Sequence, residues 1–237
     1  MVPEQLAQWR EELKDKTPRN IVRWATALFG KKLVQGTGLG SEDQVITHLL
    51  ADSAPEADIV FVDTGRHFQQ THELLQETNT HYGLDIRIHF PNGESLEQML
   101  AEDGPNLFHK SVALRRSCCA VRKHDPLKRA LAPYDAWLSG HRRRQGPERE
   151  ELEVISYDEV NQLVRINPLW NWDDKQLWDF VRLNGVPTHD LHQQGYAYPA
   201  CAPCARALKP GEAPCAGRWW WEGEDQSTNS RAQTLCV

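Results

Sequence analysis

Residues 58–64 read DIVFVDT, a run whose centre is apolar without a break. A strand that is buried on both faces has this pattern, whereas a strand with one wet face alternates polar and apolar residues. Strands covered on both faces occur mainly in parallel sheets that have helices on either side. The stretch therefore predicts an α/β fold built around a parallel sheet.

Four further strand-like runs and seven amphipathic stretches surround this one. The strand-like runs are KLVQ (32–35), DIRIHF (85–90), YDAWLSG (134–140) and LVRINPL (163–169). Helical periodicity covers 4–13, 18–29, 42–51, 67–82, 96–101, 120–131 and 173–183. From about residue 186, Gly, Pro, Cys and Trp replace the regular pattern. We therefore expect a loop-rich C-terminal segment that is organised by something other than a strand ladder.

Bulk composition fits one folded unit rather than a disordered or membrane protein. The 237 residues are 40% hydrophobic and 25% charged, which is globular composition. No apolar run approaches the roughly 18 residues that span a bilayer, and the polar N-terminus is unlike a secretion signal. We expect a cytoplasmic protein with one α/β domain at 1–222, including N-terminal helices at 1–30 and a C-terminal segment at 186–222, and a flexible tail at 223–237.

Positive charge is concentrated between residues 110 and 144, although the whole chain has a net charge of −6. Asp125 and Asp135 are the acidic residues of this stretch. Its ten basic residues are Lys110, Arg115, Arg116, Arg122, Lys123, Lys128, Arg129, Arg142, Arg143 and Arg144. Such a patch can be a solvated surface, an RNA-binding face or a site for a compact anion. The acidic remainder of the chain would repel a long polyanion, so a compact anionic substrate is favoured.

Two loops follow predicted strands, at the edge of the sheet where ligands bind in α/β folds. GTGLGSED (36–43) contains GxGxG rather than the GxGxxG dinucleotide fingerprint, so we assign no Rossmann site. A helix that begins near Ser41 would still offer backbone donors to a phosphate, unless the loop is an ordinary turn. In VDTGR (62–66), Asp63 could accept from a ribose or adenine donor, or Asp63 and Thr64 could cap the next helix.

The stretch RRSCCAVRK (115–123) places two adjacent cysteines between basic residues. Adjacent cysteines cannot readily bond to each other, because the intervening peptide strains a disulfide. Cys118 and Cys119 pair naturally with the CAPC motif, whose Cys201 and Cys204 complete a set of four thiols. Structural zinc sites usually draw on two CxxC motifs, whereas adjacent cysteines suit a cubane whose irons lie apart. The spacing favours iron–sulfur over zinc or unligated thiols.

Together these motifs resemble the assimilatory adenylyl-sulfate reductases, the iron–sulfur branch of the phosphoadenylyl-sulfate reductase family. The resemblance runs through most of the chain. Its motifs are VDTGR, CCAVRKHDPL (118–127), SGHRRRQ (139–145), WNWDDKQLWDFVRLNGVPTHDLHQQGY (170–196), CAPCARALKPGE (201–212) and AGRWWWE (216–222). The resemblance implies an adenine nucleotide α-hydrolase-like fold and a [4Fe-4S] cluster. It also implies reduction of adenosine 5′-phosphosulfate to sulfite and AMP, with electrons from thioredoxin or a glutaredoxin-like donor.

The resemblance also assigns roles to individual residues. Cys118, Cys119, Cys201 and Cys204 would hold the cluster, and Lys123 would bridge the negative charges of cluster and substrate. We interpret the three tryptophans at 219–221 as packing residues rather than a platform for adenine. The strand-end pattern and the resemblance together mark the following residues for substrate binding: Ser41, Asp63, Thr64, Gly65, Arg66, Arg142, Arg143, Arg144 and Arg218.

The expected nucleophile is a cysteine in the C-terminal tail. In the family such a cysteine lies in a Glu-Cys-Gly-Leu-His motif and attacks the sulfate sulfur to form a thiosulfonate. Here only Cys236 can take this role, although it lacks the flanking Glu, Gly and His. Cys215 stands where the family commonly has Arg. It could be an alternative nucleophile, a resolving partner for Cys236 or an inert substitution, and the inert reading is favoured.

Three functional hypotheses follow from these residues. The first is the reductase, for which the cluster cysteines imply the unphosphorylated substrate rather than its 3′-phosphorylated relative. The second is another sulfur-handling nucleotide enzyme, such as a tRNA thiolation enzyme, but GTGLGSED lacks its SGGxDS-type ATP loop. The third is a non-catalytic four-cysteine metal module, which would not need VDTGR or a terminal thiol. We expect no membrane or nucleic-acid partner, and a homo-oligomer stays open.

Overall fold

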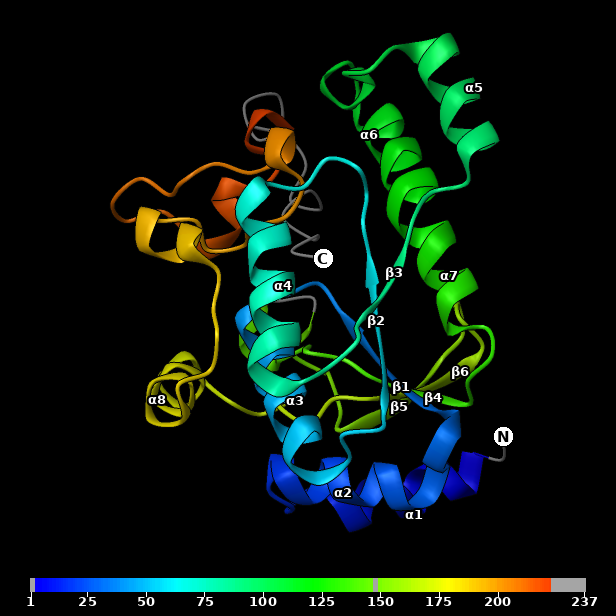
Figure 1. The fold of residues 1–237 in the computed structure, drawn as a ribbon, viewed down its shortest axis with the longest axis vertical. Coiled ribbons are helices and arrows are strands. Elements are labelled where there is room, and N and C mark those ends of the chain that lie inside the picture. The colour runs from blue at the N-terminus through cyan, green and yellow to red at the C-terminus, as the bar shows by residue number, and fades with distance from the viewer. Residues whose placement is uncertain (1–2, 147–148, 223–237) are drawn as a thin grey trace.

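The computed structural model describes residues 3–146 and 149–222, and a six-stranded sheet lies at its centre (Figure 1). The strand order is β3-β2-β1-β4-β6-β5. The parallel strands are β1 (Leu33–Thr37), β2 (Asp58–Val62), β3 (Arg87–His89), β4 (Ala136–Leu138) and β6 (Leu163–Ile166). This confirms the α/β fold and all five predicted strands. The expectation of a flexible tail at 223–237 lies outside the described residues.

The edge strand β5 (Ile155–Asp158) is absent from the sequence prediction, and it pairs antiparallel with β6. Its sequence is ISYD, which is too short and too polar to give a strand signal by itself. Backbone pairing with β6 therefore defines this strand, and its position at the edge of the sheet accounts for its mixed composition.

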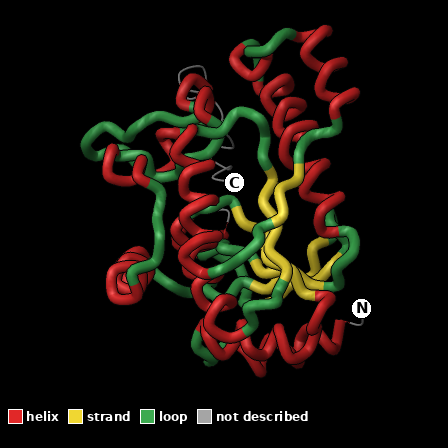
Figure 2. The backbone as a smooth tube through the Cα atoms, viewed as in Figure 1, coloured by secondary structure: helices red, strands yellow, loops and turns green. Residues whose placement is uncertain are grey.

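Eight α-helices surround the sheet in the described part of the chain (Figure 2). They are α1 (Pro3–Leu13), α2 (Pro18–Phe29), α3 (Ser41–Ser53), α4 (Gln69–Tyr82), α5 (Gly93–Asp103), α6 (Val112–Cys119), α7 (Asp125–Leu131) and α8 (Asp174–Asn184). Helices α1 and α2 lie at one end of the molecule, and α5 and α6 lie at the other (Figure 1). None of the described helices has the length and apolar character that a bilayer crossing requires.

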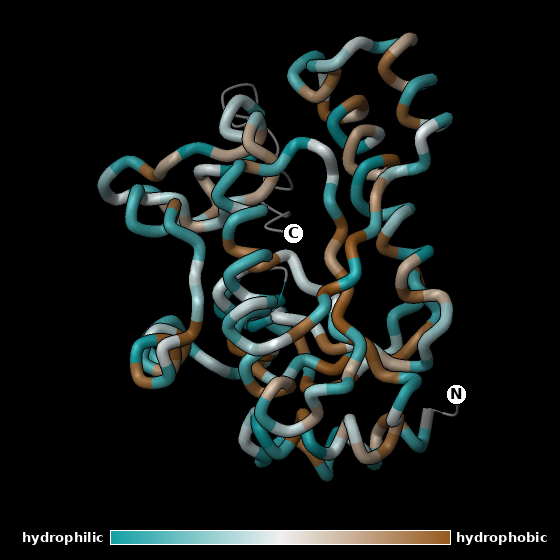
Figure 3. Tube along the Cα trace, in the orientation of Figure 1, coloured by the Kyte–Doolittle hydropathy of each residue, from teal (hydrophilic) through white to brown (hydrophobic). Residues whose placement is uncertain are grey.

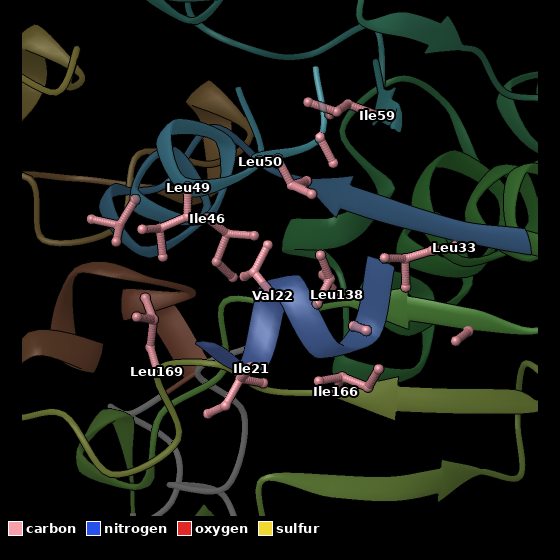
Figure 4. Close-up of a cluster of buried hydrophobic side chains, with 14 of the residues drawn as sticks. Ile21, Val22, Leu33, Ile46, Leu49, Leu50, Ile59, Leu138, Ile166 and Leu169 are labelled. Carbon is pink, nitrogen blue, oxygen red and sulfur yellow. The ribbon is translucent and has the colours of Figure 1, made fainter. Parts of the chain in front are cut away.

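Successive side chains of the inner strands enter two different cores, one on each face of the sheet. In β2, Ile59 and Phe61 belong to the larger core, while Val60 belongs to the smaller one. Helices α2 and α3 supply the larger core, as Figure 4 shows for side chains such as Val22 and Ile46. Helix α7 covers the opposite face, and the strands between the layers are the most hydrophobic part of the trace (Figure 3). The unbroken apolar centre of DIVFVDT follows from this double coverage.

The predicted helix at 120–131 begins too late, because the chain is already helical from Val112. The Ser111 hydroxyl accepts a hydrogen bond from the Leu114 amide and caps α6. Residues 120–124 then form a π-helical turn before α7 continues. The wider π turn shifts the helical period at this point, so no single amphipathic pattern covers the whole segment.

The strand order reverses between β1 and β4, since β2 and β3 lie on one side of β1 and β6 lies beyond β4. In open α/β sheets, ligands bind outside the carboxyl ends of the strands at such a switch point. Here those ends lead into GTGLGSED after β1 and SGHRRRQ after β4. The two loops are packed tightly, because a Cβ on Gly140 would lie 2.9 Å from Cβ of Glu42.

We predict that Gly140→Ala destabilises the protein by about 1–3 kcal/mol, because the added methyl overpacks the contact with α3. The matched control is Gly93→Ala, since a Cβ at Gly93 meets no atom within 4 Å and this residue begins a helix. Urea unfolding curves of both variants give the comparison. Equal stability of the two variants would show that the β1 and β4 loops are not held against each other.

Candidate functional site

A third apolar cluster, apart from the two cores of the sheet, organises the loop-rich C-terminal segment. We call it the cysteine core. Its buried members are Met99, Leu107, Phe108 and Cys204, and its partly buried members are Leu96, Leu100, Leu114, Cys118, Val121, Cys201, Trp219 and Trp221. Trp219 and Trp221 therefore pack as expected, whereas Trp220 is 44% exposed. The cluster joins α5 and α6 to residues that lie about a hundred positions later in the chain.

The four predicted ligand cysteines come from three local structures. Cys118 and Cys119 end α6, Cys201 forms an isolated antiparallel bridge with His67, and Cys204 ends a 3-10 turn that begins at Ala202. All four are free thiols. The bridge also explains why α4 begins at Gln69 rather than at the predicted residue 67.

Electrostatics tie these four thiols together. Burial raises the pKa of Cys204 to about 12, and the three other thiols add to the shift. Burial likewise raises the pKa of Cys118 and of Cys119. These three thiols would stay protonated at neutral pH by themselves, and a bound metal centre would have to displace their protons.

Lys123 and Arg218 bring positive charge next to the thiols. Neither side chain forms an ion pair or a hydrogen bond with any residue that the structure describes, and Nε of Arg218 is buried without a partner. Burial and their mutual repulsion lower the pKa of Lys123, whereas Cys201 and Cys119 raise it. Burial also lowers the pKa of Arg218. Two cations in this position favour the binding of an anion.

The VDTGR turn after β2 lies beside the thiols. Oγ1 of Thr64 is 3.2 Å from Sγ of Cys201, and Oδ1 of Asp63 accepts a hydrogen bond from the Gly65 amide at 2.8 Å. Gly65 has a φ of 69°, which favours glycine. The Arg66 side chain turns away and donates to the Pro105 carbonyl and the Asn106 side chain. Of the predicted residues in this motif, Thr64 is therefore the one whose side chain contacts one of the four thiols.

The β1–α3 loop approaches the same cations. Oδ2 of Asp43 accepts from the Gly38 amide at 2.7 Å. Burial raises the pKa of Asp43 to about 6, although the Gly38 amide and Lys123 lower it. The Ser41 hydroxyl lies 3.1 Å from Nε2 of His192, whose Nδ1 lies 2.9 Å from the Tyr196 carbonyl. Since a carbonyl only accepts, Nδ1 carries the proton, and Ser41 must donate to Nε2.

The three consecutive arginines after β4 have different surroundings. Arg142 is 3% exposed, donates to Glu42 at 2.8 and 3.0 Å and forms an ion pair with Asp174. Arg143 donates to the Leu152 carbonyl and stacks on the Trp170 ring. Arg144 is exposed and forms no hydrogen bond or ion pair with another described residue. Arg144 therefore keeps all its donors for an anion.

Cys215 is not one of the four free thiols. Sγ of Cys215 lies 3.8 Å from the Gln145 carbonyl, next to the arginine run. Cys236, the predicted nucleophile, lies outside the described residues. Asp43 and Arg122 have no role in the sequence-based prediction, and the Arg122 guanidinium donates to the Thr64 carbonyl at 2.7 Å. Asp43 lies in GTGLGSED and Arg122 lies in CCAVRKHDPL. A carboxylate shortly after a strand is the sequence feature that could have marked Asp43 as a site residue.

Solved structures place this arrangement in a class of adenine nucleotide α-hydrolase-like folds. The phosphoadenylyl-sulfate (PAPS) reductase from Candida auris matches with a TM-score of 0.75 at 29% identity, covering 88% of this chain and 98% of that chain. The NH3-dependent NAD synthetase from Campylobacter jejuni shares the fold alone, with a TM-score of 0.52 at 9% identity over 80% of this chain and 78% of that chain.

The phosphoadenosine phosphosulfate reductase domain matches residues 32–207, and the chain belongs to this family. Proteins named adenosine 5′-phosphosulfate reductase are similar over most of its length. The one from Burkholderia cepacia is 38% identical over 82% of this chain and 78% of its own. The one from Allochromatium vinosum is 41% identical over 81% and 75%. The resemblance seen in the motifs is therefore confirmed.

We predict that Arg142→Ala costs about 3–5 kcal/mol of folding free energy, because it leaves the Glu42 carboxylate buried without its cation. Arg144→Ala is the matched control from the same run, and an exposed side chain of this kind should change stability by less than about 0.5 kcal/mol. Urea unfolding distinguishes the two variants. If both lose the same stability, Arg142 has no special structural role.

Proposed function

We propose that this protein reduces adenosine 5′-phosphosulfate to sulfite and AMP in sulfate assimilation. Its relatives are named adenosine 5′-phosphosulfate reductases, which supports the substrate. The observation that carries the proposal is the placement of Lys123 and Arg218, which lie beside the free thiols of Cys119 and Cys201 and form no ion pair in the described part of the chain. A phosphosulfate is a compact dianion, and it would supply the missing negative charge.

The four thiols fit a [4Fe-4S] cluster held by Cys118, Cys119, Cys201 and Cys204. No group of three or more His, Cys, Asp or Glu side chains in residues 3–146 and 149–222 is placed to enclose a single metal ion. A cubane makes a different demand, because each of its four irons takes one thiolate and the sulfurs stay farther apart. Bound there, the cluster would supply a fixed negative charge and a crosslink between α6 and the C-terminal segment.

The two cations would offset the repulsion between a cluster and the substrate. At an effective dielectric constant of about 20, two unit charges about 6 Å apart interact by about 3 kcal/mol. Lys123 and Arg218 are already desolvated by the protein, so little reorganisation would be needed when the anion arrives. We assign Lys123 to charge stabilisation beside the thiols and Arg218 to binding of the phosphosulfate.

The nucleotide would lie across the switch point of the sheet. The β1–α3 loop offers backbone amides to the 5′-phosphate, and Arg144 has free donors on the β4 side. Asp63 and Thr64 would border the site at the end of β2. Because the Ser41 hydroxyl donates to His192, Ser41 would contact the substrate only as an acceptor.

The chemistry would proceed through a covalent adduct on Cys236. Its thiolate attacks the sulfate sulfur, the bond between sulfur and the phosphate oxygen breaks, and AMP leaves with the electron pair. A dithiol donor, thioredoxin or a glutaredoxin-like protein, then attacks the cysteine sulfur and releases sulfite. The second thiol of the donor closes its disulfide and frees Cys236, so the donor supplies the two electrons.

For the metal centre, we predict that protein purified without oxygen contains about four irons and four sulfides per chain. Cys204→Ser should lose iron and sulfide, because one iron would lose its thiolate. Cys215→Ser should keep them, because this residue lies outside the set of four. Metal and acid-labile sulfide analysis decides the matter, and zinc without sulfide would contradict the proposed cluster.

For the reaction, we predict that protein mixed with adenosine 5′-phosphosulfate and no reductant releases AMP and keeps sulfite on the peptide that contains Cys236. Cys236→Ser should abolish the adduct and leave AMP binding intact, whereas Cys215→Ser should still form it. Peptide mass spectrometry locates the adduct. An adduct on Cys215 would show that Cys236 is not the nucleophile. Preferential use of the 3′-phosphorylated substrate would show that the proposed substrate is wrong.

A further inference from the structure

Arg115 is a buried cation that the proposed chemistry leaves unused. It lies on α6, and 4% of its surface is exposed. Its Nε donates to Oε1 of Glu222 at 2.8 Å, and its Nη2 donates to Oε2 at 2.9 Å. This two-bond geometry fixes both the distance and the orientation of the carboxylate. The pair joins the helix of Cys118 and Cys119 to the end of the GRWWWE motif.

Trp219 lies between this pair and the anion site. Its ring is 4.1 Å from the guanidinium carbon of Arg115 and 4.4 Å from that of Arg218. The Trp219 backbone has a φ of 45°, a left-handed conformation that a bulky residue rarely adopts. Such a conformation costs about 1–3 kcal/mol and persists only where the surroundings hold it. Contacts at this position must therefore hold Trp219 in place.

Arg218 depends on Trp219 in turn. Its guanidinium forms no hydrogen bond or ion pair with another residue of the described chain, so the Trp219 ring is the aromatic partner that fixes its direction. A cation that stacks on a ring is held by attraction to the ring face and still has its N–H donors available. The side chain is thus oriented without being neutralised.

We propose that Arg115 and Glu222 are positioning residues, which hold Trp219 so that its ring directs Arg218 toward the anionic substrate. This inference rests on the proposed function, because it assigns Arg218 to phosphosulfate binding. It extends that function to residues that do not touch the substrate. The pair would act through the Trp219 ring. Arg115 also lies beside the Cys119 thiol, so an unchanged iron content is part of the test.

The central test is a double-mutant cycle between Glu222 and Arg218. Glu222→Gln keeps the side-chain shape but weakens the pair, and we expect it to raise KM for adenosine 5′-phosphosulfate about tenfold, which corresponds to about 1.4 kcal/mol. The rate at saturation and the iron content should stay near those of the unaltered protein. In the background of Arg218→Ala, Glu222→Gln should change KM less than twofold.

The matched control is another two-bond pair in the same segment. Arg206 donates to both carboxylate oxygens of Glu212, at 2.7 and 2.9 Å, and Arg206 stacks on no ring among the described residues. Glu212→Gln should leave KM unchanged. Equal effects of Glu222→Gln and Glu212→Gln would overturn the proposal, and so would an effect of Glu222→Gln that persists in full without Arg218.

A second variant keeps the test decisive if Glu222→Gln disturbs folding. Trp219→Leu removes the ring and leaves the ion pair, and it should raise KM in the same direction and lose its effect in the Arg218→Ala background. Retention of the original KM by Trp219→Leu would contradict the proposal. AMP binding and turnover by the unaltered protein distinguish failure of the proposed function from failure of the positioning role. If the unaltered protein neither binds AMP nor turns over, the proposed function is wrong. If it turns over normally and Trp219→Leu leaves KM unchanged, only the positioning role is wrong.

Discussion

Two cations that form no ion pair with any described residue, Lys123 and Arg218, define the centre of this molecule. An unpaired charge near the interior is costly unless an anion or a hydrogen-bonding partner compensates it. Lys123 and Arg218 form no ion pair or hydrogen bond with a described residue, and Asp43 acts on Lys123 only from a longer distance, while Arg115 and Arg142 are each paired with a carboxylate. The fold thus neutralises the basic residues that hold it together and leaves charge where an anion can bind.

The sheet topology explains how residues from distant parts of the sequence reach this centre. The strand order reverses between β1 and β4, and ligands bind at the carboxyl ends of the strands beside such a reversal in open α/β sheets. Asp43 is in the first turn of α3 and accepts from the Gly38 amide in the loop after β1, and Thr64 lies in the turn after β2 beside Cys201. The π-helical turn after Cys119 brings Lys123 to the same place. Arg218 arrives from the C-terminal segment, which the cysteine core holds against α5 and α6.

The sequence predicts the elements whose hydrophobic pattern is local, and it misses the elements and contacts that depend on a partner far away in the chain. The double coverage of DIVFVDT and the helical periodicities predict the sheet and its layers, but β5 exists because β6 offers it a backbone partner. The arginine run shows the same limit at the site. Arg142, Arg143 and Arg144 are three identical residues in a row. Only the tertiary positions of Glu42 and Trp170 show that the first two are held by the fold and that Arg144 is exposed. The Arg115–Glu222 pair joins residues 107 positions apart and gives no sequence signal.

The C-terminal segment joins one of the four thiols to one of the two cations through its backbone. Its backbone pairs Ala205 with Arg218 in a β-bridge, and the Trp219 amide donates to the Cys204 carbonyl at 3.1 Å. Gly217 permits this close approach, because a Cβ there would lie 2.6 Å from the Arg206 carbonyl oxygen. Cys204 and Arg218 therefore cannot move independently. Any group that fixed the four thiols would also fix Arg218, so under the proposed function cofactor loading and substrate affinity would be coupled through the same few residues.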